Sequence, residues 1–118
     1  MPALNFESQF ANAVRDGFKS QTIRAPRKKP IKEGDTLYLY TGMRTKNCIK
    51  LNEVICDSVL DFNIHMDGWG CDVGPCMVRD KDELNKLARA DGFEDWFEMV
   101  RWFIYNHGLP FKGNLILW

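Results

Sequence analysis

Apolar residues near the start of the chain recur at three- and four-residue spacing, which is typical of an amphipathic helix. The residues of this stripe are Phe6, Phe10, Ala13, Val14 and Phe18. We therefore predict a helix over residues 7–18, with Gly17 near its end, where a left-handed residue commonly terminates a helix. Residues 21–24 alternate polar and apolar side chains and predict a short strand, which directs Thr22 and Arg24 to the same face.

The middle of the chain is rich in β-branched and apolar residues, with turn residues between the runs. In order, the pattern predicts a basic loop at 25–33, a strand at 36–41, a second basic loop at 42–47, one long bent strand or two strands over 48–66, a turn at 67–70, and a hairpin at 71–78. This part of the chain is therefore expected to supply most of the sheet.

Two helices and a strand are predicted for the last third of the chain. Asp80 precedes the first helix and Glu83 follows three residues later, close to a capping box, and Gly92 ends this helix. A second helix is expected over residues 95–106, and an apolar strand over 113–118. The order of elements predicts one α+β domain over residues 1–118, built on a strongly curved sheet or barrel. The last strand is expected to close the sheet, because its apolar run should not lie on an open edge.

Composition adds a charge asymmetry to this picture. The chain has 118 residues, the size of one domain, and its 16 basic and 16 acidic side chains give a formal net charge of zero. A total of zero argues against a strongly cationic nucleic-acid binder. However, residues 1–50 hold ten Lys and Arg against four Asp and Glu, whereas the remainder holds six against twelve. Such asymmetry can mark a local anion-binding surface.

The sequence also predicts the cellular compartment. No apolar stretch approaches the length needed to span a bilayer, and the first residues lack the basic and apolar regions of a signal peptide. We therefore expect a cytoplasmic protein without a membrane partner, and a monomer. In that compartment its four cysteines are expected to be reduced thiols.

The densest candidate chemistry lies in residues 17–24, with the sequence GFKSQTIR. Residues 19–32 contain six basic side chains and no acid, which can bind phosphates or form a solvated loop. Lys19 and Arg24 differ from the rest because they flank the short strand. A lysine with a depressed pKa can deprotonate a nearby threonine, which gives Lys19 and Thr22 a catalytic interpretation.

This segment resembles the Gly-x-Lys-x-x-Thr-x-Arg signature of ASCH domains, which are related to PUA-like RNA-binding barrels. The resemblance continues through residues 30–40 (PIKEGDTLYLY), 88–93 (ARADGF), 99–103 (MVRWF) and the terminal strand, and is weakest between 47 and 78. It implies a PUA-like barrel with helices closing a cationic cleft. In small bacterial members, that cleft hydrolyses the amide of N4-acetylcytidine with a Lys, a Thr three residues later and a Glu from the later helical region.

By this resemblance Lys19 and Thr22 match the first two catalytic positions, and Asp91 matches the third. Asp91 is one methylene shorter than the Glu of the family, so Glu83 and Glu94 are alternatives for the acid. Thr22 would attack the acyl carbonyl, Lys19 would take its proton, and Asp91 would orient the exocyclic nitrogen or carry a proton to it. This reaction needs no cofactor and no metal.

Further residues are expected to bind the substrate. Arg24 matches the arginine of the family and would line the pocket. The other candidates for substrate binding are Tyr40 at the end of a strand, Arg44 in the second basic loop, Trp69 in a Gly-flanked turn, where it can stack on a base or pack within the loop, and Glu83.

A zinc site is the weaker alternative for the cysteines and histidines. Its candidate ligands are Cys48, Cys56, His65, Cys71, Cys76 and His107. The spacing of Cys71 and Cys76 is not the usual C-x2-C, and the two histidines lie far apart in sequence. Cysteine is often simply buried.

Two functional hypotheses follow. The first is an amidohydrolase acting on N4-acylated cytidine as a small nucleoside. The second is a non-catalytic module that binds RNA or a nucleotide in the same cleft, and a ribonuclease is a weaker third. The zero net charge favours a small uncharged nucleoside, held where the basic and acidic halves meet, over a long polyanion.

Overall fold

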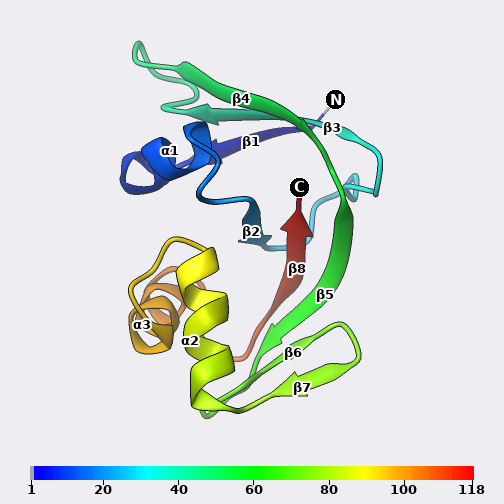
Figure 1. The fold of residues 1–118 in the computed structure, drawn as a ribbon, viewed down its shortest axis with the longest axis vertical. Coiled ribbons are helices and arrows are strands. Elements are labelled where there is room, and N and C mark those ends of the chain that lie inside the picture. The colour runs from blue at the N-terminus through cyan, green and yellow to red at the C-terminus, as the bar shows by residue number, and fades with distance from the viewer. Residues whose placement is uncertain (1) are drawn as a thin grey trace.

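The chain forms two sheets that share one hydrophobic core (Figure 1). The structure is a computed structural model, and it describes residues 2–118. The smaller sheet has the strand order β1 (Ala3–Phe6), β3 (Thr36–Thr41), β4 (Ile49–Ile55), with β1 parallel to β3 and β3 antiparallel to β4. The larger sheet is antiparallel and has the order β2 (Gln21–Arg24), β8 (Phe111–Leu117), β5 (Ser58–Ile64), β6 (Cys71–Val73), β7 (Cys76–Val78).

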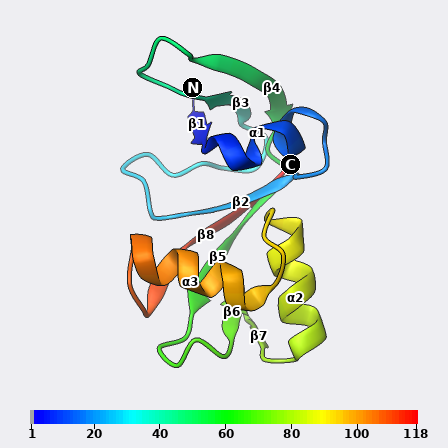
Figure 2. The same ribbon diagram turned by 90° about the vertical axis from the view of Figure 1, so that its left-hand side faces the viewer.

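The helices divide between the two ends of the molecule. α1 (Ser8–Arg15) contacts β1, β3 and β4, whereas α2 (Lys81–Ala90) and α3 (Trp96–Asn106) pack on each other at the far end, as Figures 1 and 2 show. The β2–β8 pair runs between these groups. The stretch between α1 and β2 therefore lies close to the junction of α2 and α3.

Both later helices have an acidic N-cap, of which the sequence predicted the first, Asp80. Asp80 caps α2 by accepting a hydrogen bond from the backbone N–H of Glu83, and Asp95 caps α3 in the same way through Glu98. These bonds satisfy backbone donors that the first turn of a helix leaves unpaired. The α2 helix ends at Ala90, before Gly92, as expected from the sequence.

The first helix is shorter than predicted. It ends at Arg15, and Gly17 then adopts φ +82°, which turns the chain away from the helix axis. As a result Phe18 is 85% exposed and does not belong to the apolar stripe. Phe6 belongs instead to β1, an element that the periodicity does not predict, and its side chain is buried.

The strands of the middle segment follow the prediction closely. β3 has the predicted bounds, and residues 48–66 form two strands with a break at Cys56 and Asp57. At this break the chain leaves the smaller sheet and enters the larger one. β6 and β7 pair as the expected hairpin.

The predicted barrel is wrong for the described residues, because the two sheets are not closed on each other. β8 therefore does not close the sheet as predicted, but it lies inside the larger sheet, between β2 and β5, so its apolar run avoids an open edge as expected. No ladder joins β1 to β2 within residues 2–118. Instead the Arg24 guanidinium of β2 donates to the carbonyl of Asn5 in β1 at 2.7 Å. A side chain thus bridges the two edges where a barrel would have backbone pairing.

The core extends through both groups of elements. Its fully buried side chains include Leu37 and Leu39 of β3, Phe62 of β5 and Phe103 of α3. A cluster of this kind supplies the main stabilisation of a small domain.

Within residues 2–118 no helix is long and apolar enough to cross a membrane.

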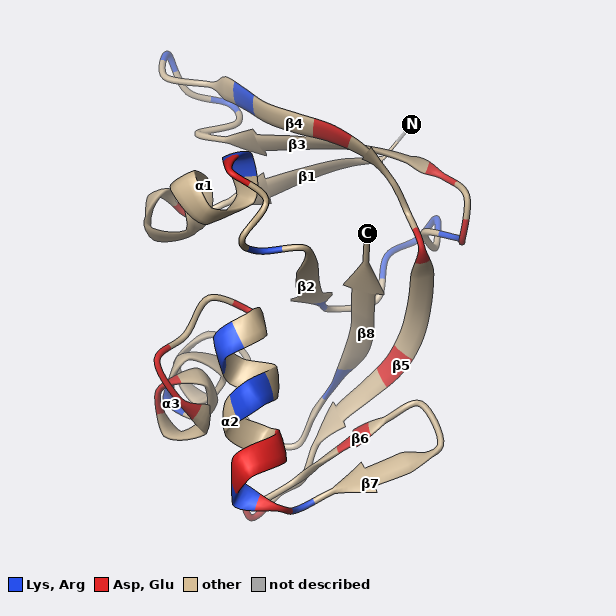
Figure 3. Cartoon of the chain, in the orientation of Figure 1, with Lys and Arg blue, Asp and Glu red and all other residues tan. Residues whose placement is uncertain are grey.

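Figure 3 shows where the charge asymmetry lies in space. Basic residues occupy the loops that follow β2 and β3, and acidic residues concentrate at the starts of α2 and α3. The two halves of the chain meet where the α1–β2 connection approaches the end of α2. That junction contains the candidate site.

Candidate functional site

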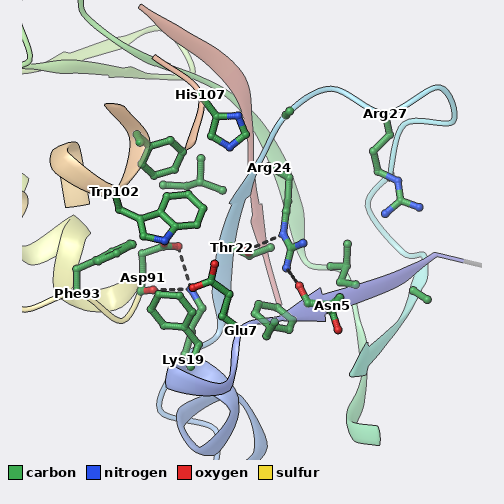
Figure 4. A pocket seen from close by; sticks show the side chains of 17 residues that line it. Asn5, Glu7, Lys19, Thr22, Arg24, Arg27, Asp91, Phe93, Trp102 and His107 are labelled. Carbon is green, nitrogen blue, oxygen red and sulfur yellow. Dashed lines mark hydrogen bonds and ion pairs between the residues drawn. The ribbon is translucent and has the colours of Figure 1, made fainter. Parts of the chain in front are cut away.

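A cavity of about 420 Å³ lies between the first quarter of the chain and the α2–α3 region (Figure 4). Its lining comes from β1, the start of α1, β2 with the residues on either side, the α2–α3 connection and the second half of α3. The volume falls within the range of about 300–1,000 Å³ typical of small-molecule sites. Four residues singled out by the sequence, Lys19, Thr22, Arg24 and Asp91, all line it.

Two chain reversals bring Lys19 and Asp91 together. After α1 the chain turns at Gly17, and the Lys19 N–H donates to the carbonyl of Ala13, which fixes Lys19 just before β2. Asp91 is the C-cap of α2, and the following Gly92 has φ +98°. A Cβ atom on Gly92 would lie 2.7 Å from the Phe10 ring, so only glycine allows this approach of α2 to α1.

The Lys19 ammonium is held by Asp91 at two atoms. Its Nζ lies 3.1 Å from Oδ1 and donates to the main-chain carbonyl oxygen at 2.6 Å. Gln21 makes a longer contact from Nε2 to the same Oδ1, at 3.4 Å. Lys19 and Asp91 are 3% and 5% exposed, so this ion pair is almost wholly removed from solvent.

Burial changes the proton affinity of both partners. Desolvation lowers the pKa of the Lys19 ammonium, and the attraction of Asp91 offsets this only in part. Desolvation likewise raises the pKa of the Asp91 carboxyl, against the opposing effect of Lys19. Compared with the same groups in water, the buried Lys19 amine and the buried Asp91 carboxyl are both shifted toward their neutral forms. A proton can therefore be exchanged within the pair at smaller cost than between a free lysine and a free aspartate.

Thr22 and Arg24 face the same cavity from β2. The Arg24 Nε donates to the Thr22 hydroxyl oxygen at 3.0 Å, and its guanidinium also lies 4.7 Å from the centre of the Phe6 ring. Because Thr22 Oγ1 accepts from a cation, negative charge on this oxygen would be stabilised. The alternation predicted from the sequence, with Thr22 and Arg24 on one face, agrees with this contact.

The remaining wall is aromatic. Phe93 lies edge-on to Phe10 at 5.3 Å and is tilted against Trp102 at 6.0 Å, and Trp102 contacts His107 at 6.0 Å between ring centroids. The Lys19 Nζ lies 5.2 Å from the centre of the Phe10 ring. The cavity thus combines a charged, hydrogen-bonded side with a surface suited to a flat aromatic ligand.

Several predicted substrate-binding residues lie elsewhere. Tyr40 lies in β3, opposite Asn5 in the register, and Arg44 is exposed in the β3–β4 loop at φ +67°. Glu83 is exposed in the first turn of α2. None of these three lines the cavity that contains Lys19.

Trp69 also lies apart from the Lys19 cavity. It is 66% exposed and lines a second cavity of about 570 Å³, with Trp96 and Phe97 of the α3 start.

Glu94, an alternative for the acid, is exposed and its N–H donates to Glu98 Oε2. Of the three acids considered, the structure brings Asp91 to Lys19.

Phe10 and Arg27 are among the cavity-lining residues that the sequence did not assign to the site. Phe10 was assigned to the helix core, yet its ring also lies under the Lys19 ammonium. Arg27 belongs to the basic loop for which phosphate binding and a solvated loop both stayed open, and it lines the cavity. The available signal was the closeness of both residues in sequence to the motif at residues 17–24.

The cysteines do not gather around one point. Among residues 2–118 no group of three or more His, Cys, Asp or Glu side chains is arranged to hold a metal ion. Cys48 and Cys76 are exposed, whereas Cys56 and Cys71 are buried, and all four are free thiols. Burial raises the pKa of the Cys71 thiol to about 12, which makes it unreactive as a nucleophile.

Comparison of the chain with protein-family models, with curated proteins and with solved structures gives no match.

Proposed function

We propose that this protein hydrolyses the acyl amide of N4-acylated cytidine, converting N4-acetylcytidine to cytidine and acetate. The observation that carries the proposal is the buried Lys19–Asp91 pair in the same cavity as the Thr22 hydroxyl. Amide hydrolysis requires a nucleophile, a carrier of protons and stabilisation of an oxyanion. A hydroxyl, a lysine–aspartate pair and a guanidinium are suited to these roles. The resemblance of residues 17–24 to ASCH domains narrows the substrate to acylated cytidine.

The first half-reaction begins with a proton moving from Lys19 to Asp91, which leaves a neutral amine and a neutral acid. The Lys19 amine then takes the hydroxyl proton of Thr22 as Oγ1 attacks the acyl carbon. The C–N bond breaks, and Asp91 gives its proton to the leaving N4 nitrogen. The products are cytidine and an acyl ester on Thr22, and the Lys19–Asp91 pair returns to its ionic form.

The second half-reaction removes the acyl group. The proton again moves from Lys19 to Asp91, and a water molecule loses a proton to the Lys19 amine as it attacks the ester. Lys19 passes this proton to Thr22 Oγ1 when the ester bond breaks, and Asp91 then returns its proton to Lys19, which restores the ionic pair. Acetic acid loses its own proton to solvent. The burial of the pair supports this role, because a fully solvated lysine is almost entirely protonated at neutral pH and cannot accept a proton.

The cavity walls support the choice of a flat heterocyclic leaving group. Phe93 and Trp102 present aromatic surface within the cavity, on which a cytosine ring can stack. Arg24, bonded to Thr22 Oγ1, is positioned to stabilise negative charge close to the attacking oxygen.

The test is to incubate the purified protein with N4-acetylcytidine and identify cytidine and acetate by chromatography and mass spectrometry. Asn47→Ala, a change in the exposed β3–β4 loop, is the control for variants of the cavity residues and should retain activity. Unchanged substrate in the presence of folded wild-type protein would refute the proposal for this substrate.

A binding module that uses the same cavity without catalysis is the second candidate. It is favoured by the exposed cations Arg27, Lys28 and Lys29, which lie on the loop directly after β2. Binding of single-stranded RNA along this loop would weaken steeply with added salt, because phosphate contacts release counterions. Hydrolysis of an uncharged nucleoside should depend much less on salt, so the two candidates are separable.

A further inference from the structure

Arg27 lies at the edge of the Lys19 cavity. It stands on the loop after β2, and Figure 4 shows its side chain on the same chain segment as Arg24, with both guanidinium groups extending toward β1. Among residues 2–118 the Arg27 guanidinium forms no hydrogen bond and no ion pair. It is therefore an exposed, charged donor with no protein acceptor among these residues.

Within residues 2–118 no acidic group forms an ion pair with Arg27. Asp91 is engaged by Lys19, and Arg24 donates to two neutral oxygens, Thr22 Oγ1 and the Asn5 carbonyl. Glu7 also lines the cavity, and its carboxylate accepts a hydrogen bond from Gln9. Burial lowers the pKa of Arg24, Asp91 opposes this shift, and the like charge of Arg27 adds a smaller lowering. An anion between the two guanidinium groups would relieve this repulsion.

The cationic lining continues past Arg27. A separate hollow of about 430 Å³, distinct from the one beside Trp69, is lined by Arg27 together with Lys29 and Asp35. The Asp35 carboxylate already accepts a hydrogen bond from the Lys32 N–H at 2.9 Å. Arg27 is thus shared by two adjoining hollows, with Arg24 on its inner side and Lys29 on its outer side.

We propose that this site takes a phosphate monoester, so that the substrate is the nucleotide form of the acylated cytidine, with Arg27 as the main phosphate ligand and Arg24 and Lys29 beside it. The identity of the base rests on the proposed function. The base and the acyl group occupy the inner cavity near Lys19 and Thr22, and the ribose phosphate extends to the mouth. A guanidinium offers two parallel donors that match phosphate oxygens, and several cations around one position suit a dianion better than a carboxylate.

The kinetic test compares N4-acetylcytidine 5′-monophosphate with N4-acetylcytidine. In wild-type protein kcat/KM should be about 10- to 100-fold higher for the monophosphate, the range expected for a charged hydrogen-bonded contact. Arg27→Gln should bring this ratio toward one. Lys28→Gln removes an equal charge from the same loop, but Lys28 lines none of these hollows, so the ratio should persist. Equal kcat/KM for the two substrates in wild-type protein would overturn the proposal.

A binding measurement separates this inference from the proposed function. By calorimetry, cytidine 5′-monophosphate should bind more tightly than cytidine to the wild-type protein, and Arg27→Gln should abolish the difference. If this preference appears without any amide hydrolysis, the proposed function fails and the phosphate site stands. If N4-acetylcytidine is hydrolysed but phosphate brings no preference, the phosphate site fails and the proposed function stands.

A third comparison addresses the source of the phosphate. A dinucleotide that carries the acylated cytidine on a phosphodiester tests whether an RNA chain is the natural ligand. A preference for the dinucleotide over the monophosphate, with Lys28→Gln as damaging as Arg27→Gln, would contradict the monoester proposal and indicate RNA. Absence of binding by both cytidine and its monophosphate would also overturn it.

Discussion

Lys19 and Asp91 are 72 positions apart in sequence, yet the lysine ammonium contacts both the carboxylate and the main-chain oxygen of the aspartate. The carboxylate contact is 3.1 Å long and the main-chain contact 2.6 Å. Because one bond is made to the backbone, the position of the Lys19 ammonium depends on where α2 ends as well as on the aspartate side chain. The pair thus joins the end of α2 to the segment before β2.

The buried pair should show strong energetic coupling in a double-mutant cycle. Lys19→Met removes the cation and leaves a buried carboxyl without a charged partner, which should destabilise the protein by about 3–5 kcal/mol. Asp91→Asn leaves the main-chain contact of Lys19 in place and should cost less. The double variant should lose less than the combined loss of the two single variants, by at least about 1 kcal/mol in the free energy of unfolding. Urea unfolding measures all four proteins, and simple additivity would show that the two side chains do not interact.

The pH dependence of hydrolysis should be bell-shaped. The proposed reaction needs one proton shared by Lys19 and Asp91, so activity falls when the pair gains a second proton or loses its only one. Because burial raises the pKa of Asp91, the acid limb should lie above the range of an ordinary carboxyl. Because burial lowers the pKa of Lys19, the alkaline limb should lie below that of an ordinary lysine.

The measurement is kcat/KM for N4-acetylcytidine across the pH range in which the protein stays folded. In Asp91→Asn the residual activity should rise with pH as Lys19 loses its proton, and it should lose its alkaline limb, since no carboxyl remains to hold the proton of the pair. A profile of unchanged shape in this variant would show that another group controls the reaction.

Thr22 offers a clean test of the nucleophile. Thr22→Val preserves shape in a position only 5% exposed but removes the hydroxyl, so kcat should fall at least about a thousandfold. Thr22→Ser keeps a hydroxyl and should retain measurable activity. Mass spectrometry of rapidly quenched Thr22→Ser protein should detect one added acetyl group on residue 22. Equal activity in wild type and Thr22→Val would exclude Thr22 as the nucleophile.

Gly92 should be essential for the position of Asp91. An alanine there must adopt φ +98° and place its Cβ 2.7 Å from the Phe10 ring, so α2 must move away from α1. Gly92→Ala should therefore destabilise the protein by more than the roughly 1 kcal/mol that a left-handed non-glycine residue costs, and it should reduce hydrolysis. Gly108→Ala is the control, since Gly108 has φ +80° with no atom within 4 Å of the added Cβ. Equal losses of stability in the two variants would show that the contact with Phe10 does not matter.

The local elements were largely predictable from the sequence. β3 follows from its β-propensity, α2 from its apolar face and the acid at its N-cap, and α3 from its apolar stripe. β1 was not predictable, because four residues carry too little periodicity and its pairing with β3 is a parallel contact distant in sequence. The open arrangement of the two sheets was equally hidden, because strand pairing between β1 and β2 depends on tertiary packing. The Arg24 side chain links these two edges through the Asn5 carbonyl.

The candidate site was predictable in part. Lys19, Thr22 and Arg24 lie within six residues, so the strand alternation and the motif suffice to group them. Asp91 could be assigned only through the family resemblance, because propensity does not report which helix end meets Lys19. Trp69 had the character of a stacking residue, but the packing of α3 assigns it to a different hollow.

The most direct test of the central claim is the rate at which purified protein converts N4-acetylcytidine to cytidine, followed by ultraviolet absorbance, with Lys19→Met measured alongside. Circular dichroism must first establish that the variant is folded. We predict turnover by the wild-type protein and a rate at least about a thousandfold lower in Lys19→Met. No conversion by folded wild-type protein, or equal rates in the two proteins, would contradict the account.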